Sequence, residues 1–186
     1  ENLDPSKQIF LASDVTAFGV YATRFDDFLR VGYVKPAFDI FRVFRARVKE
    51  RSEIALALLE RDFDYSVAEQ YHFNRDDASW PNSETELNEL WRKRVKNDLL
   101  VLKLADRTME QAKKTLTLRY EGISRRAHQL NSNDVFQLFM NAYTTAVEPH
   151  TSYFSPRTSE NFKIRMSLSL EGIGAALQTD NEHTVV

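Results

Sequence analysis

Several kinds of residue that often carry protein chemistry are absent or scarce in this 186-residue sequence. It contains no cysteine, which excludes disulfides, thiol nucleophiles, cysteine-ligated zinc and iron–sulfur clusters within it. Only five glycines and five prolines are present, so few positions interrupt regular secondary structure. The densest apolar stretch, 99–104, is short and contains Lys103. We therefore expect no transmembrane segment.

The sequence also lacks a strong excess of either charge. It has 25 basic and 27 acidic residues, a net charge of −2, which does not favour electrostatic capture of nucleic acid. We expect no nucleic-acid partner. The hydrophobic content is 42%, with 13 Phe, 7 Tyr and 2 Trp, which is ample apolar surface for a core. A chain of this length is expected to bury about 70% of the surface that its unfolded form exposes.

Apolar residues recur at three- and four-residue spacing through the first two thirds of the chain, which is typical of helices packed on a shared core. Asn74–Ser83 has the composition of a loop. We predict a mainly α fold, with a multi-helix domain over residues 1–156. The predicted helices are 13–32, capped by Ser13 or Asp14 and stopped at Gly32; 36 to about 62–65, with Pro36 in its first turn; 83–102, opened by a Ser83/Glu86 capping box; about 108–130; and 131–147, capped by the run 131–134.

The pattern changes after Pro156. We predict a short helix to about Arg165, then an alternating strand over 167–170. A second strand over 175–178, a turn over 179–182 and a third strand over 183–186 follow. Because two or three short strands do not form a stable sheet alone, residues 157–186 are interpreted as a linker and the incomplete beginning of a β domain.

A search for catalytic patterns finds no nucleophile–base motif. Neither Gly-x-Ser-x-Gly nor Ser-x-x-Lys occurs, and the four histidines are too far apart to form a helical metal pair. We expect no metal and no cofactor.

The cluster 92–96, rich in Arg and Lys, is consistent with contacts to phosphate or an acidic partner, but the polar face of an amphipathic helix explains it better. The aromatic segment 38–44 has two interpretations, core packing and a partner-binding groove, of which core packing is the simpler.

One segment suggests binding. Residues 170–175 carry two glycines directly before a predicted strand: Leu170, Glu171, Gly172, Ile173, Gly174 and Ala175. Such a loop can turn consecutive backbone N–H groups toward one anion, while the strand edge accepts a peptide by strand addition. The segment is therefore a candidate pocket for a peptide carboxylate. A glycine-containing bend between two strands is the alternative.

The order of motifs resembles a known family. Asn141-Ala142-Tyr143, then Glu148-Pro149-His150-Thr151-Ser152-Tyr153-Phe154-Ser155-Pro156, then Ser167-Leu168-Ser169-Leu170-Glu171-Gly172-Ile173-Gly174-Ala175 resemble the segment that enters the PDZ domain of carboxyl-terminal processing, or tail-specific, proteases. The opening, from Asp4 to Leu11 with Asp14, and the stretch 23–27 resemble the amino-terminal helical domain of the long periplasmic bacterial branch. The family more often has Asp at the position of Glu148.

The resemblance implies a periplasmic serine endopeptidase, its signal peptide removed, that binds the free, apolar carboxyl termini of protein substrates through its PDZ domain. Cell-envelope proteins are among the implied substrates, and a tetratricopeptide-repeat lipoprotein is an implied adaptor. The implied serine/lysine dyad lies beyond this chain, so no catalytic residue is expected here. The carboxylate-binding role is carried over to the loop Leu170–Gly174 and the strand from Ala175, and 148–153 would be a structural junction.

A second hypothesis is a self-standing helical adaptor or scaffold whose carboxyl-terminal strand docks another protein. A reading frame that continues for several hundred residues, with a serine and a lysine in a later α/β domain, would favour the protease. A stop after Val186 would favour the adaptor.

Overall fold

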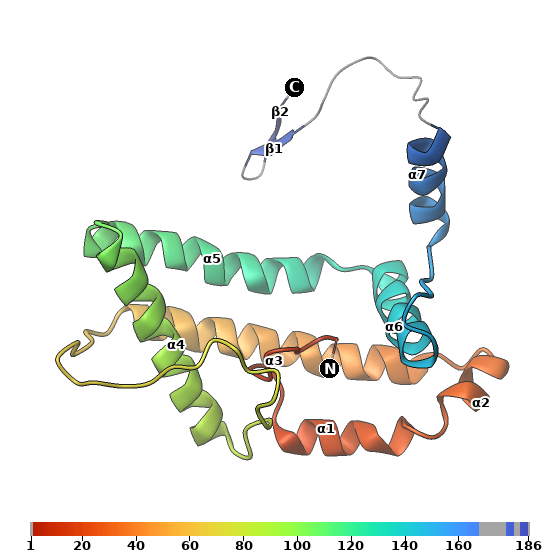
Figure 1. Ribbon diagram of the computed structural model, residues 1–186, viewed down its shortest axis with the longest axis horizontal. Helices are drawn as coiled ribbons and strands as arrows, with labels where there is room; N and C mark the ends of the chain where they lie inside the picture. The colour runs from red at the N-terminus through yellow and green to blue at the C-terminus, as the bar shows by residue number, and fades with distance from the viewer. Residues whose placement is uncertain (1, 168–177, 181–182, 186) are drawn as a thin grey trace.

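The computed structural model describes residues 2–167, 178–180 and 183–185. The described part is mainly helical, as predicted (Figure 1). The elements in chain order are α1 (Ala12–Phe18), the 3₁₀ helix η1 (Gly19–Tyr21), α2 (Phe25–Arg30), α3 (Lys35–Leu59), α4 (Glu84–Leu104), α5 (Met109–Gln129), α6 (Ser132–Val147), α7 (Pro156–Ser167), β1 (Gln178–Asp180) and β2 (His183–Val185).

The first predicted helix, 13–32, is wrong as a single element. It is divided into α1, η1 and α2, and α1 begins one residue earlier than the predicted caps, with Leu11 in extended backbone at the N-cap. Phe18, Phe25 and Phe28 are each partly buried on either side of this break, and the rings of Phe25 and Phe28 pack against each other. The predicted stop is correct: Gly32 has φ +70°, and the N–H of Tyr33 donates to the carbonyl of Phe28 at 2.7 Å, as in a Schellman motif.

The starts of the later helices follow the predicted signals. Pro36 lies in the first turn of α3, where its missing N–H costs no hydrogen bond. The side chain of Asn131 accepts the N–H of Asp134 at 3.2 Å, and Asp134 accepts the N–H of Asn131 at 2.9 Å. Ser83 accepts the N–H of Glu86 at 3.2 Å. The reciprocal half of that predicted box differs, because Glu86 accepts the N–H of Asn82 instead.

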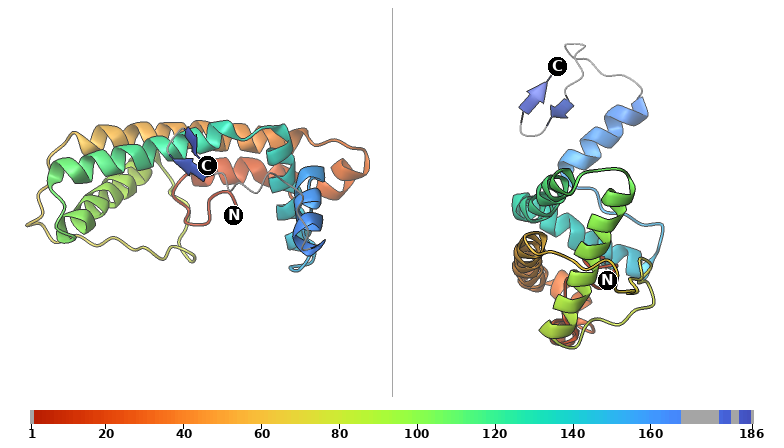
Figure 2. Two further views of the ribbon diagram at one scale, coloured as in Figure 1. Left: turned by 90° about the horizontal axis from the view of Figure 1, so that it is seen from above. Right: turned by 90° about the vertical axis from the view of Figure 1, so that its left-hand side faces the viewer.

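A core of three helices holds the domain together. The helices α3 and α5 lie side by side, and α4 crosses them (Figures 1 and 2). Each contributes one apolar stripe, as predicted for amphipathic helices. Buried residues of this core are Ala55, Leu58 and Leu59 from α3, Leu87, Trp91, Val95 and Leu99 from α4, and Ala112, Leu116 and Tyr120 from α5. The second predicted helix ends too late, because α3 stops at Leu59 and the chain then runs irregularly to Ser83.

The carboxyl-terminal predictions need two corrections. Ser167, predicted to start a strand, is the last residue of α7. Thr179 and Asp180, predicted as part of a turn, belong to β1, which pairs antiparallel with β2 so that Thr179 lies opposite Thr184. Residues 168–170 and 175–177 of the predicted strands lie outside the described residues, and the PDZ-like character of this part stays a prediction. None of the described helices is long and apolar enough to cross a membrane.

Candidate functional site

The predicted carboxylate-binding residues, 170–175, lie outside the described residues. Their role stays a prediction. The described part contains three other features that bear on function: a clasp that fixes the amino-terminal segment, an apolar groove beside it, and the junction that leads from α6 to α7.

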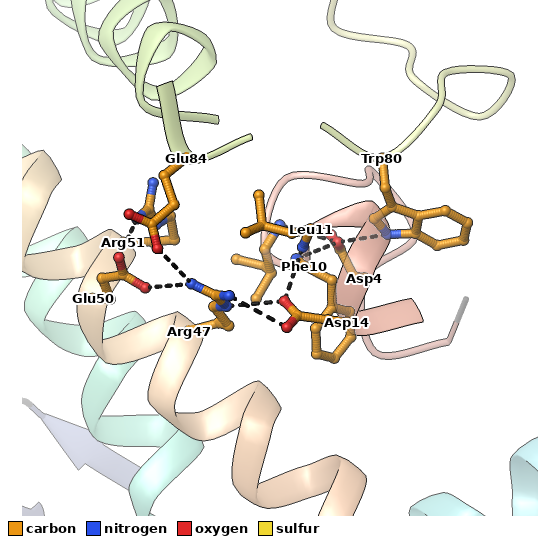
Figure 3. Close-up of polar contacts among 10 residues, drawn as sticks. Asp4, Phe10, Leu11, Asp14, Arg47, Glu50, Arg51, Trp80 and Glu84 are labelled. Carbon is orange, nitrogen blue, oxygen red and sulfur yellow. Dashed lines mark hydrogen bonds and ion pairs between the residues drawn. The ribbon is translucent and has the colours of Figure 1, made fainter. Parts of the chain in front are cut away.

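The amino-terminal clasp is built around the carboxylate of Asp4, which is only 3% exposed. It accepts the backbone N–H groups of Gln8, Ile9 and Phe10 at 2.8–3.0 Å. It also accepts the indole N–H of Trp80 at 3.1 Å (Figure 3). Four donors on one buried carboxylate satisfy its charge without a cation in direct contact. Asp4 therefore ties residues 8–10 to the loop that precedes α4.

Further contacts close the clasp onto the core. The indole of Trp91, on α4, donates to the carbonyl of Gln8 at 2.7 Å. Lys7 has a positive φ of 51°, which is uncommon for a residue with a side chain. Its ammonium group donates to the carbonyl of Asp76 and lies 5.6 Å from the ring centre of Trp80. These long-range contacts hold Lys7 in its unfavourable backbone conformation.

Arg47, on α3, connects this helix to α1 and α4. Its guanidinium binds both carboxylate oxygens of Asp14, with Nε–Oδ2 at 2.9 Å and Nη2–Oδ1 at 3.3 Å (Figure 3). It also contacts Glu50 at 3.1 Å and Glu84 at 3.5 Å. The hydrogen bond that Arg47 donates to Asp14 is the largest influence that raises the pKa of Arg47. Asp14 itself accepts the N–H of Leu11 at 3.0 Å, so one carboxylate both starts α1 and anchors it to α3.

Arg92, Arg94 and Lys96 of the basic cluster 92–96 have intramolecular partners. Glu69, from the loop before α4, contacts both Arg92 and Lys96, and these hydrogen bonds lower its pKa to about 2. Arg94 donates to the side chain of Gln8 at 3.1 Å, and its guanidinium lies 4.6 Å from the ring centre of Trp91. The interpretation of this cluster as a solvent-exposed polar face is thus incomplete. Lys96 is buried and holds the long loop before α4 through Glu69.

An apolar groove of about 650 Å³ lies between the clasp and the helices α1, α2, α3 and α6. Aromatic and aliphatic side chains form most of its walls. They include Phe10, Phe18, Phe25, Phe41, Val135, Leu138, Phe139, Tyr143 and Val147. The ring centres of Phe25 and Phe139 lie 5.3 Å apart, so these two rings pack against each other. Hydrogen-bonding groups are few on these walls, so the groove suits an apolar side-chain array and not a charged small molecule.

The structure confirms core packing for the aromatic segment 38–44, and partner binding there stays a prediction. Phe41 is buried and packs against Phe44 at 5.6 Å, which confirms core packing. Phe41 also lines the groove, together with Ile40. The sequence alone could not show that Phe41 lines a groove, because the α6 side of the groove starts at Val135, far from Phe41 in the chain.

The junction between α6 and α7 is held by side chains of α6. Asn141 accepts the N–H of Tyr153 at 2.7 Å, and Gln137 accepts from the hydroxyl of Thr158 at 3.1 Å. Glu148 accepts the N–H of His150 and the hydroxyl of Thr151, at 2.9 and 2.7 Å. The carboxylate at position 148 thus organises a short turn, and the residues predicted as a structural junction are found as one.

The described residues include no group of three His, Asp or Glu side chains placed to hold a metal ion. The clasp was not predicted as a unit. Its sequence signals are the opening segment with Asp14, which carries part of the family resemblance, and the polar loop before α4. The sequence pattern that points to the groove is likewise limited to the aromatic segment 38–44.

Comparison with known sequences identifies the family of the chain. A family profile described as the tail-specific protease N-terminal domain matches residues 1–157, which is most of the chain. The chain belongs to this family. The tail-specific protease of Haemophilus influenzae is 40% identical over 183 residues, which is 98% of this chain and 26% of that protein. The chain thus spans about a quarter of the length of a tail-specific protease that it matches.

Proposed function

We propose that this chain is the amino-terminal helical domain, 1–156, together with the linker and start of a PDZ domain, 157–186, of a periplasmic serine-type tail-specific endopeptidase. The observation that carries the proposal is the family match over residues 1–157 together with 40% identity to a named tail-specific protease. The length of that relative supports a longer parent protein. No observation favours the self-standing adaptor.

In the proposed protein the catalytic serine and lysine lie downstream of this chain. The loop Leu170–Gly174 binds the free carboxylate of a substrate, and the strand from Ala175 pairs with its last residues. Substrates are proteins with apolar carboxyl termini, among them cell-envelope proteins, and a tetratricopeptide-repeat lipoprotein acts as adaptor. The helical domain contributes structure and docking surface rather than chemistry.

Cleavage assays on the full-length protein and on residues 1–186 test this proposal. Both are incubated with an unfolded protein that ends in an apolar residue with a free carboxylate. We expect cleavage by the full-length protein and none by residues 1–186, because no nucleophile–base motif occurs in this sequence. Cleavage by repurified 1–186 that is lost on mutating one of its serines would overturn the proposal. A full-length protein with no tail-dependent cleavage would overturn it equally.

A further inference from the structure

Exposed apolar side chains flank the apolar groove on α6. On its α6 wall, Leu138 is 42% and Val147 is 71% exposed. The next helix, α7, carries further exposed apolar side chains, among them Phe162, Ile164 and Met166. A hollow of about 650 Å³ beside such side chains is more than the scattered exposure that is normal for a protein surface. An apolar hollow of this kind is a candidate docking site.

The shape of the groove indicates what covers it. Its walls are helices and the clasp, and the two described strands pair with each other. An extended peptide therefore has no strand edge to pair with along these walls. A helix needs no such edge, because its backbone hydrogen bonds are internal, and it can insert one apolar stripe between the rings.

The route of the chain indicates where that helix comes from. The polypeptide leaves the domain through α6, which forms one wall, and α7, which follows it (Figure 1). This chain spans about a quarter of the related protease. Under the proposed function, on which this inference rests, most of the polypeptide follows Val186. A tethered segment has an effective concentration of up to the millimolar range, which favours it over a free partner.

We propose that the apolar groove between α1, α2, α3 and α6 is the docking site for an amphipathic helix of the same polypeptide, carboxyl-terminal to Val186. The helix inserts apolar side chains beside Phe25, Leu138 and Phe139. It couples the amino-terminal domain to the part of the protein that follows the PDZ segment. The clasp fixes Phe10 at one wall and so keeps the groove open for this helix.

Photocrosslinking in the full-length protein tests the proposal. Leu138→p-benzoylphenylalanine places the reactive group in the groove, and the same change at Leu118, which is 56% exposed on α5 and does not line the groove, is the matched control. Crosslinked peptides are identified by mass spectrometry in an equal mixture of ¹⁵N-labelled and unlabelled protein. Thermal unfolding verifies that each variant is folded, and Val147→p-benzoylphenylalanine replaces the first variant if it is not.

The expected product at Leu138 joins it to a peptide beyond Val186, with both halves carrying the same isotope. Its yield should be unchanged over about a hundredfold dilution, because the reaction is intramolecular. Leu118 should give no such product. Mixed isotopes would assign the groove to a second copy, crosslinks to an added substrate protein would assign it to substrate, and no crosslink would leave it uncovered. Each of these three results overturns the proposal.

Tail-dependent cleavage is measured on the same preparations. If cleavage persists while the expected crosslink is missing, only the docking proposal fails. If the unsubstituted full-length protein does not cleave, the proposed function fails instead.

Discussion

Arg47 on α3 and Asp14 on α1 form a two-point ion pair, with both guanidinium–carboxylate contacts at 3.3 Å or less. Both side chains are largely buried. Such paired contacts are stronger and more directional than single ones. Since Asp14 also accepts the N–H of Leu11, this pair fixes α1 and hence one wall of the apolar groove.

Replacing Asp14 by alanine should therefore remove a helix cap and leave Arg47 without its principal partner. We expect a loss of about 1–3 kcal/mol in the free energy of unfolding, measured by urea denaturation. The control is Glu53→Gln, which breaks an exposed pair with Lys49 in the same region and should change stability by about 0.5 kcal/mol or less. Equal effects of the two changes would contradict the anchoring role of Asp14.

The clasp gives a second prediction. Asp4→Asn keeps the shape of the side chain but replaces one acceptor oxygen by an NH₂ donor among four N–H groups. We expect a loss of about 2–3 kcal/mol, together with a changed fluorescence of Trp80. Asp77→Asn, on the exposed neighbouring loop, should lie within about 0.5 kcal/mol of the unsubstituted protein. If Asp4 does not stabilise the fold, both variants will show the same small change in the free energy of unfolding.

Much of this arrangement can be predicted from the sequence, and there are physical reasons why the rest cannot. Apolar spacing correctly identified the buried face of α4, with Leu87, Trp91, Val95 and Leu99, because a helix repeats its contacts locally. It fails at Gly19–Arg24, where the same spacing continues through a break whose turns are closed by hydrogen bonds from the N–H of Ala22 to Gly19 and from the N–H of Arg24 to Tyr21. The clasp was missed because Asp4 and Trp80 are 76 residues apart, and no local pattern reports such a contact.

The acid response of Glu69 is a third prediction. Its pKa is lowered to about 2 by hydrogen bonds from Arg92 and Lys96, whereas an unfolded glutamate titrates near 4.5. Between these values the unfolded chain binds the proton and the folded chain does not. The contribution of Glu69 is therefore present above about pH 4.5 and is lost as the pH falls toward 2.

Denaturation of the unsubstituted protein and Glu69→Gln from pH 7 to pH 2.5 measures this contribution. The stability difference between them should be constant from pH 7 to about pH 5 and should shrink below that. Glu53→Gln provides the comparison for an exposed carboxylate. A difference that stays constant to pH 2.5 would show that Glu69 is not held in its ionised form by the cluster.

The α6–α7 junction gives a fourth prediction. Asn141→Ala removes the acceptor of the Tyr153 N–H without touching the three-helix core. Hydrogen exchange at Tyr153 should accelerate about five- to tenfold, equivalent to ~1 kcal/mol, while the exchange of core amides stays unchanged. Asn133→Ala, at the exposed start of the same helix, should leave Tyr153 unaffected. Uniformly faster exchange would mean that Asn141 supports the whole domain rather than the junction.

The central proposal is that the chain belongs to a protease that binds the free carboxyl terminus of its substrates through residues 170–175. Its most direct test is a binding titration of the full-length protein with an apolar peptide ending in a free carboxylate and with its amidated twin. Gly172→Val should disfavour any positive-φ backbone and intrude on the anion site. We predict that the unsubstituted protein prefers the free acid and that Gly172→Val loses this preference while its helical domain stays folded. Equal binding of the two peptides by the unsubstituted protein, or full preference retained by Gly172→Val, would contradict the claim.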